Sequence, residues 1–365
     1  MVKKAEYFLA TPAPSGFCAL FEQAFFAPEE GMVMLLKGSA GSGKSTLLKK
    51  AANMLEDMGL EVERIRCASA PDSLDGILCP AVKLAAFDAT APHVIEPILP
   101  GAFEHMVTLY DTVCENELCE QREVLWFHEQ EAKKYRMRAV RYLTAAGCLL
   151  DDTARTARCC TDEPKILRCA ASLAKRYLTA PGGTGECEVR LLDAMTPQGV
   201  VCLEQTVYAL ADTVVALEDE WGAAAPVLME ALCRMATSQG LDVVACRDCF
   251  SPQQQIRHLI VPSLRLAFVT VGGVYPAPSR VSRTIHAKRF TNMDGIRARR
   301  NRLRFNRKSC RDLLLQASEM LRESAAHHAE QERIYTHAMK VEALDERTRQ
   351  VLEYLRSYAV QKKQG

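Results

Sequence analysis

Apolar runs alternate with amphipathic stretches in the first hundred residues of the chain. Met32–Lys37 is a short apolar run of the kind that forms a buried parallel strand, and Val82–Asp88 is a second one. Between them, Leu47–Leu55 has the apolar spacing of a helix that packs on a sheet, whereas Leu60–Cys67 alternates like a strand. Strands that alternate with helices predict an α/β fold with a parallel sheet. Residues 100–178 are expected to be helical.

The stretch between the first apolar run and the first predicted helix is rich in glycine. It reads Gly-Ser-Ala-Gly-Ser-Gly-Lys-Ser-Thr and fits G-x-x-x-x-G-K-[ST], the phosphate-binding loop motif. Glycines let the backbone approach a polyphosphate closely, and the N–H groups at the start of the following helix favour an anion. The motif predicts that Lys44 reaches the β- and γ-phosphates of ATP and that the Ser45 hydroxyl binds Mg²⁺. The residues expected to contact the nucleotide are Gly38, Gly41, Ser42, Gly43, Lys44, Ser45 and Thr46.

Carboxylates downstream of the loop are candidates for the chemistry. Asp88 ends an apolar strand, the position from which a carboxylate holds Mg²⁺ in P-loop enzymes, so we expect it to bind the metal together with Ser45. The alternative is a strand-end cap. Asp75 is the candidate for orienting the attacking water, with Asp72 as its competitor. His93 follows in a loop, either as a contact to phosphate or base or as an ordinary capping residue.

The second half of the chain repeats the first at an offset of about 182 residues. Cys67-Ala68-Ser69 corresponds to Cys249-Phe250-Ser251, and residues 77–85 correspond to residues 259–267. We therefore predict a tandem duplication of an α/β unit, with a helical segment after each copy. The predicted organisation is a first repeat over residues 1–178, a linker over 179–186 and a second repeat over 187–365.

The phosphate loop has no intact counterpart in the second repeat. The aligned segment, residues 218–227, opens with three consecutive acids, and like charges repel a polyanion. Ala225 replaces the phosphate-binding lysine, and Thr270 replaces the carboxylate predicted to hold Mg²⁺. We therefore expect the second repeat not to bind a Mg-nucleotide.

In these features the chain resembles a bacterial family of two-repeat P-loop ATP-binding proteins. The resemblance spans most of the chain and rests on the loop and helix of residues 37–50, on Cys67 with residues 71–76, and on residues 87–93 and 100–102. It implies a P-loop fold, ATP binding and hydrolysis of the nucleotide. Members of the family keep a phosphate loop in both repeats, so the second repeat of this chain departs from the family pattern.

Charge and cysteine content narrow the class of protein. The 365 residues include 46 Lys and Arg against 45 Asp and Glu, so the whole molecule is not an evident polyanion binder. With no apolar run of about 18 residues, we expect no membrane-spanning helix. The 15 cysteines are scattered and odd in number, which favours reduced thiols in a cytoplasmic protein. Cys246 and Cys249 form a lone C-x-x-C, interpreted as buried small residues, with a redox dithiol as the alternative.

One segment is strongly basic in this nearly neutral chain. Residues 280–311 contain twelve Lys and Arg and a single acid, Asp294. The bias indicates either a surface for RNA, DNA or another polyanion, or an arginine that reaches the phosphates of the first-repeat site. The third alternative is a solvated or ion-paired helix face. Phe290 and Phe305 are the only aromatic residues of the segment, too few to indicate base stacking.

The leading hypothesis is a cytoplasmic P-loop ATPase with one Mg-ATP site in the first repeat. Water would attack the γ-phosphate in line, and catalysis would depend on positioning and electrostatic stabilisation. Two alternatives remain open. One is a kinase-like phosphotransferase with a small acceptor. The other is a nucleotide-sensing regulator that binds with little turnover and contacts a partner or nucleic acid through its basic repeat.

Overall fold

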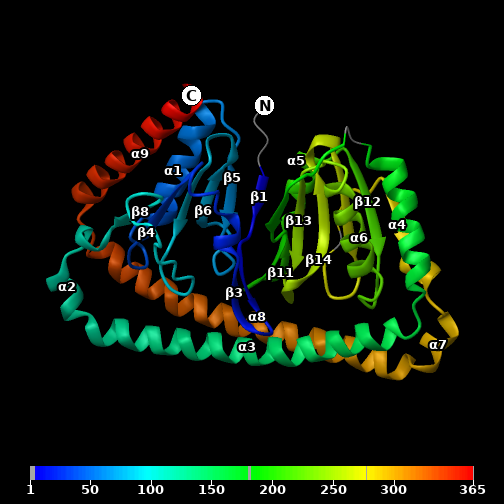
Figure 1. Ribbon diagram of the computed structural model, residues 1–365. Helices are drawn as coiled ribbons and strands as arrows, with labels where there is room; N and C mark the ends of the chain where they lie inside the picture. The colour runs from blue at the N-terminus through cyan, green and yellow to red at the C-terminus, as the bar shows by residue number, and fades with distance from the viewer. Residues whose placement is uncertain (1–4, 180–181, 277, 365) are drawn as a thin grey trace. The chain divides into compact units, whose positions relative to one another are not determined.

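The computed structural model describes residues 5–179, 182–276 and 278–364, which build two six-stranded, mostly parallel sheets (Figure 1). The first sheet has the strand order β1 (Ala5–Tyr7), β5 (Glu63–Arg66), β6 (Leu74–Cys79), β7 (Leu84–Asp88), β4 (Met32–Lys37) and β8 (Glu104–Thr108). Only β6 runs antiparallel to its neighbours. The apolar run of β4 is therefore an interior strand with parallel partners on both sides, as its composition predicts.

The second sheet repeats this order strand for strand. It runs β9 (Cys187–Arg190), β13 (Val243–Asp248), β14 (Ser251–Val261), β15 (Leu266–Val271), β12 (Thr213–Glu218) and β16 (Arg283–His286), with β14 antiparallel. Each repeat also contains a strand hairpin, β2 (Ala10–Ala13) with β3 (Gly16–Ala19) and β10 (Asp193–Thr196) with β11 (Gly199–Cys202). Lys83 and Arg265, the only non-glycine residues with positive φ within the described residues, occupy equivalent positions before β7 and β15. These matches indicate an internal duplication.

The helices follow the same repeat. Helix α1 (Lys44–Asp57) follows β4, and α6 (Ala225–Thr237) follows β12. The second repeat also has α5 (Glu204–Leu210) before β12. Each repeat ends in a helical tail, α2 (Glu115–Glu120), α3 (Arg122–Arg158) and α4 (Glu163–Tyr177) in the first, and α7 (Met293–Ala298), α8 (Arg300–His337) and α9 (Val341–Gln364) in the second. Short 3₁₀ helices are η1 (Phe21–Ala24), η2 (Pro80–Val82), η3 (Tyr110–Thr112), η4 (Pro262–Leu264) and η5 (Ala287–Phe290). Over the described ranges, no helix has the length and apolarity needed to cross a membrane.

The α/β class is confirmed, whereas the all-helical prediction for residues 100–178 is wrong at its start. There the chain forms β8, which adds to β4 at the sheet edge. Its residues alternate only between partly buried and exposed positions after Glu104, so this short edge strand lacks the apolar alternation that identifies a strand from sequence.

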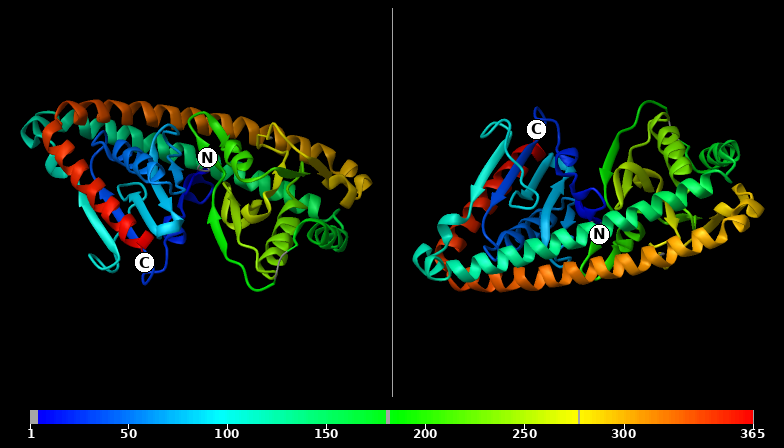
Figure 2. Two further views of the ribbon diagram at one scale, coloured as in Figure 1. Left: turned by 90° about the horizontal axis from the view of Figure 1, so that it is seen from above. Right: turned by 90° about the horizontal axis from the view of Figure 1, so that it is seen from below.

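The helical tails are exchanged between the repeats. One compact unit consists of residues 1–10, 25–138 and 320–365, and the other of residues 11–24 and 139–319. In the first unit α9 of the second repeat packs on α1, and in the second unit α4 of the first repeat packs on α6 (Figures 1 and 2). The compact units therefore do not coincide with the predicted domains 1–178 and 187–365. The predicted linker, 179–186, lies between α4 and β9, and its residues 180–181 fall outside the described residues.

The exchange buries apolar residues that the sheets alone do not cover. On α9, Val351, Leu355 and Ala359 share a core cluster with Leu48 and Leu55 of α1. On α4, the equivalent contribution to the core around α6 comes from Ile166, Ala170, Leu173 and Ala174. Both tails therefore contribute to the hydrophobic core of the unit in which they lie.

We predict that Leu355→Ala lowers the free energy of unfolding by about 2–5 kcal/mol, because it leaves a cavity against α1. Urea denaturation followed by circular dichroism measures the change. Val360→Ala, at an exposed position on the same helix, is the matched control and should change the free energy by less than about 0.5 kcal/mol. Equal effects of the two substitutions would contradict the packing of α9 on α1.

Candidate functional site

The glycine-rich loop connects β4 to α1 at the carboxyl end of an interior strand. Gly41 and Gly43 adopt left-handed conformations, with φ of 67° and 82°. A Cβ atom at Gly38 would lie 2.4 Å from the Oγ atom of Ser42, so close approach also requires glycine there. The three glycines of the motif are thus set by backbone conformation and packing.

Lys44 and Asp88 lie within ion-pair distance of each other. Asp88 ends β7 beside β4, and its Oδ2 atom lies 3.7 Å from the Nζ atom of Lys44. The buried Lys44 ammonium donates hydrogen bonds to the backbone oxygens of Gly38 and Ser39, both at 2.7 Å. Burial lowers the pKa of Lys44, and the carboxylate of Asp88 opposes that shift. A charged lysine is thus held inside the loop by backbone dipoles and one acid.

The other predicted loop contacts have different environments. The Oγ atom of Ser45 accepts a hydrogen bond of 2.9 Å from the N–H of Leu74, which ties the loop to β6. Ser42 is buried within the loop, whereas Thr46 is exposed at the start of α1. Across residues 5–179, 182–276 and 278–364, no group of three or more His, Cys, Asp and Glu side chains is arranged to hold a metal ion. The predicted Mg²⁺ ligands are therefore one hydroxyl and one carboxylate that flank the lysine.

Asp75 lies deep beside the loop, whereas its competitor Asp72 is exposed in the preceding turn. The Oδ1 atom of Asp75 is 4.0 Å from the Nε2 atom of the buried His93. Burial raises the pKa of Asp75 to about 6, against the opposing effects of His93 and of a hydrogen bond with Cys67. Asp75 is therefore a carboxyl group that titrates close to neutral pH near the predicted phosphate site.

Residues of the second-repeat tail also border the loop, and sequence reasoning missed them. A Cβ atom at Gly41 would lie 2.7 Å both from the backbone oxygen of Glu332 and from the Oγ1 atom of Thr336, at the end of α8. One at Gly43 would lie 3.1 Å from the side chain of Leu344 in α9. No motif marks these positions, because their role depends on the exchange of tails.

The degenerate loop of the second repeat binds an anion of its own. Asp219 is 4% exposed, and its carboxylate accepts hydrogen bonds from four backbone N–H groups at the start of α6. Oδ1 accepts from Trp221 and Gly222 at 3.2 and 3.1 Å, and Oδ2 accepts from Ala224 and Ala225, both at 2.8 Å. An internal carboxylate therefore takes the place that an anionic ligand would take at this helix N-terminus.

The three acids of this segment are arranged differently from the prediction. We expected three neighbouring acids to repel a polyanion together, but each has its own partner. Glu218 lies 2.6 Å from the Nδ1 atom of His286, and Glu220 forms a 2.6 Å ion pair with Arg307. The four N–H groups, called here the anion cradle, are therefore filled by the Asp219 carboxylate. The two acids on either side of Asp219 are each paired with another residue.

The two repeats differ again at the position of the buried acid. Arg257 stands about 182 residues after Asp75, and Tyr275 stands at the same offset from His93. The guanidinium carbon of Arg257 lies 3.2 Å from the centroid of the Tyr275 ring, and its Nε atom donates to Asp193 at 2.9 Å. An acid–imidazole pair beside the first loop thus corresponds to a buried cation–π contact in the second repeat.

Comparison of the chain with models of known protein families, with curated proteins and with solved structures yields no match.

We predict that Asp219→Ala lowers the free energy of unfolding by about 1–3 kcal/mol, because four N–H groups lose their acceptor. Urea denaturation measures the loss. Glu220→Ala removes a neighbouring acid from a partly exposed ion pair and should lower the free energy of unfolding by less than about 1 kcal/mol. If the Glu220 variant lost as much stability as the Asp219 variant, the cradle would not be the structural role of Asp219.

We also predict a pH-dependent contribution of Asp75 in buffer with EDTA. The pKa of Asp75 is about 6 in the folded protein, against 3.8 for an ordinary aspartate, which represents the unfolded chain. The folded state therefore holds this proton more tightly than the unfolded chain. The contribution to stability is thus present below about pH 4 and lost as the pH rises through about 6. Relative to Asp75→Asn, the wild-type free energy of unfolding should fall by up to about 3 kcal/mol between these limits. A difference that is flat over this range would show that Asp75 is not buried as described.

Proposed function

We propose that the first-repeat loop binds Mg-ATP and that the protein hydrolyses the nucleotide, with the second repeat as a pseudo-site. The observation that carries this proposal is the contrast between the two loops. In the second repeat the backbone N–H groups converge on the carboxylate of Asp219, whereas the aligned residue of the first repeat is Gly38, which has no side chain. The aligned N–H groups of the first repeat are those of Ala40, Gly41, Gly43 and Lys44. A backbone arrangement that binds a carboxylate in one repeat is suited to a phosphate in the other.

The roles of the side chains follow from this placement. Lys44 exchanges its bonds to the loop carbonyls for the β- and γ-phosphates, while Asp88 stays within ion-pair reach of it. Ser45 and Asp88 fit Mg²⁺ because both offer the hard oxygen atoms that this ion prefers. When bound, Mg²⁺ neutralises charge that develops on the phosphate oxygens.

Asp75 is the residue proposed to orient the attacking water. A carboxyl group with a pKa of about 6 is mostly ionised at neutral pH and can accept a proton in the transition state. Glu332 of α8 is a second carboxylate beside the loop. It raises the pKa of Lys44, by less than Asp88 does. The tail of the second repeat therefore supplies part of the wall of the proposed site.

A nucleotide-sensing protein with slow turnover is the second candidate. It is favoured by the hydrogen bond from the N–H of Leu74 to the Oγ atom of Ser45. Because Mg²⁺ would compete for that oxygen, nucleotide binding would change the link between α1 and β6. Such a change is a signal that a partner can read without rapid hydrolysis.

Phosphate release from Mg-ATP by the purified chain tests the proposal. Lys44→Ala should lower kcat/KM by about 100-fold or more, because it removes the charge that stabilises the transferred phosphate. Lys50→Ala, which removes an exposed lysine of the same helix, is the matched control and should leave turnover unchanged.

Calorimetric titration with Mg-ATP separates the alternatives. Binding that depends on Lys44 without phosphate release would identify the sensing protein, and release only with an added small acceptor would identify a phosphotransferase. A folded wild-type chain that binds no Mg-ATP would overturn the proposed nucleotide site.

A further inference from the structure

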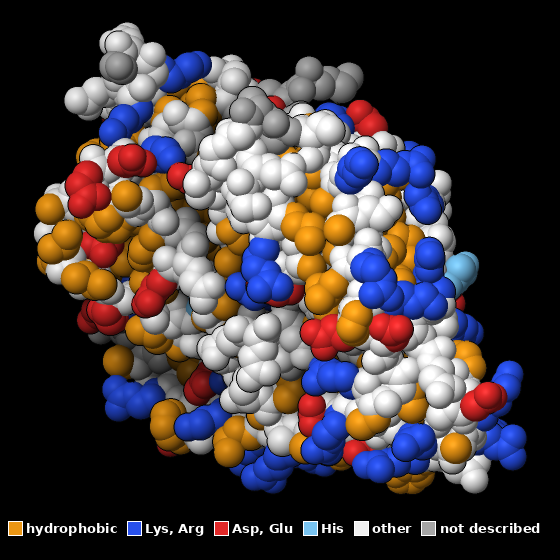
Figure 3. All heavy atoms as spheres, turned by 45° about the vertical axis from the view of Figure 1, so that its right-hand side comes forward, with side chains coloured by type: hydrophobic (Ala, Val, Ile, Leu, Met, Phe, Trp, Pro, Cys, Tyr) orange, Lys and Arg blue, Asp and Glu red, His pale blue; other side chains and the backbone are white. Residues whose placement is uncertain are grey.

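The basic segment of residues 280–311 lies entirely in the second compact unit and is only partly neutralised. Three of its twelve cations form ion pairs with carboxylates of the described residues, Arg297 with Asp294, Arg302 with Asp152 and Arg307 with Glu220. In Figure 3, Lys and Arg side chains gather on the side where Figure 1 draws α4 and α7. An ion-paired helix face therefore accounts for a minority of the segment.

Four of the remaining cations form a stripe along the first turns of α8, called here the cationic stripe. Its members are Arg300, Arg304, Lys308 and Arg311, at spacings of four, four and three residues, which place them on one face of the helix. All four are exposed, and no carboxylate of the described chain forms an ion pair with any of them. The stripe is about 16 Å long at 1.5 Å per residue.

A neighbouring face of this part of α8 is buried. Leu303, Cys310 and Leu314 are at most 8% exposed, so the helix is held in place while the stripe faces outward. Packing on one side and solvent on the other fix the cations in a row instead of leaving them on a free segment.

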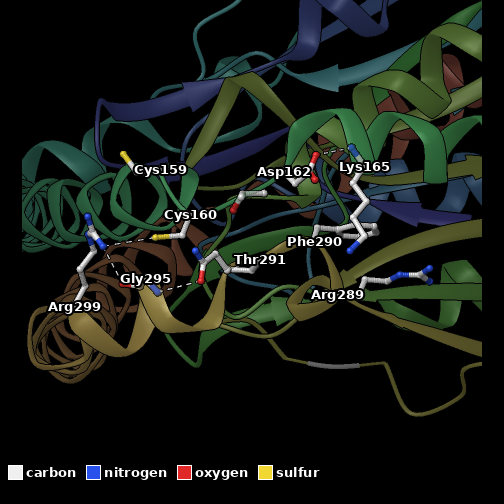
Figure 4. Close-up of a pocket in the computed structure, with 11 residues that line it drawn as sticks. Cys159, Cys160, Asp162, Lys165, Arg289, Phe290, Thr291, Gly295 and Arg299 are labelled. Carbon is white, nitrogen blue, oxygen red and sulfur yellow. Dashed lines mark hydrogen bonds between the residues drawn. The ribbon is translucent and has the colours of Figure 1, made fainter.

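A basic pocket of about 470 Å³ lies beside the start of the stripe (Figure 4). It is lined by the cations Lys165, Arg289 and Arg299 and by the polar side chains of Thr161, Thr291 and Asn292. Arg299 directly precedes the first residue of the stripe. None of the three pocket cations is in an ion pair with a carboxylate of the described residues, although Asp162 also lines the pocket.

The partners of the pocket cations leave most of their donors available. The Nη1 atom of Arg299 donates hydrogen bonds to the backbone oxygen of Gly295 at 2.9 Å and to the Sγ atom of Cys160 at 3.8 Å. Arg289 lies 5.4 Å from the ring centroid of Phe290. Asp162 caps α4 by accepting a 2.9 Å hydrogen bond from the backbone N–H of Lys165, not from its ammonium group. A guanidinium has five N–H donors and an ammonium three, which suits the oxygens of a phosphate.

We propose that the cationic stripe and the basic pocket together bind the sugar–phosphate backbone of a nucleic acid. A row of unpaired cations on a rigid helix matches a row of phosphates, and the pocket at its end can take a further phosphate group. Phe290 is 2% exposed, and Phe305 is the one exposed aromatic side chain of the segment. Recognition therefore depends on backbone charge and carries little base specificity.

Fluorescence anisotropy with labelled single-stranded RNA and DNA of about 20 nucleotides, titrated over a range of salt concentrations, tests this surface. The triple substitution Arg300→Gln, Arg304→Gln and Lys308→Gln should weaken binding and reduce the salt slope by about 2, at about 0.7 per lost phosphate contact on a single strand. The matched control is Arg297→Gln, Arg302→Gln and Arg307→Gln. It removes the same charge from the same segment, but from residues already paired with carboxylates. The control should reduce the slope by less than about 1.

Substitution of Lys165, Arg289 and Arg299 by Gln tests the pocket separately and should also weaken binding of both probes. Thermal unfolding by circular dichroism verifies that each variant is folded. Equal losses in the stripe variant and its control would overturn the proposal, because they would show a response to net charge alone. No measurable binding of either probe by the wild type at about 50 mM salt would overturn it as well. The proposal would also be overturned if pyrophosphate bound with the same affinity as the oligonucleotides, because that would identify a site for small phosphates.

Discussion

The apolar face of the helix that follows each central strand has to be covered by a second helix, and much of the chain is arranged around that need. In both units the cover comes from the far repeat, α9 over α1 and α4 over α6. Burial of apolar surface is the main favourable term in folding, so neither sheet would have its full core if its partner repeat were removed. The two repeats therefore depend on each other for stability.

The same exchange brings the tails to the two loops. Glu332 and Thr336 come against Gly41 because α8 leads into α9, and Ala154 of α3 comes within 3.9 Å of a Cβ atom built at Gly222 for the equivalent reason. At Gly41 the tail therefore presents oxygen atoms, and at the aligned Gly222 it presents a small apolar side chain.

Local features of this chain were predictable from sequence, and contacts between distant segments were not. The loop from Gly38 to Thr46 follows from local dihedral needs and from the periodicity of the flanking strand and helix. The offset of the repeats also anticipated the matching order of the two sheets. In contrast, the amphipathic pattern of α9 identifies a buried face without stating which helix buries it, and the half-exposed β8 carries no clear pattern. The acids of the second loop were evident, but the direction of the Asp219 carboxylate depends on backbone geometry.

Asp219 shows how the loop before α6 is stabilised without a lysine or a bound ligand. The N–H groups at a helix N-terminus need acceptors whether or not a ligand binds, and a buried loop without them would be unstable. Asp219, which aligns with Gly38 of the first repeat, supplies an acceptor to four of them at once. With that acceptor in place, Ala225 and Thr270 stand where the first repeat has Lys44 and Asp88. Arg257 stands where the first repeat has Asp75, donates to Asp193 and stacks on Tyr275. The second repeat thus keeps the fold that supports α4, with an internal carboxylate at the N-terminus of α6.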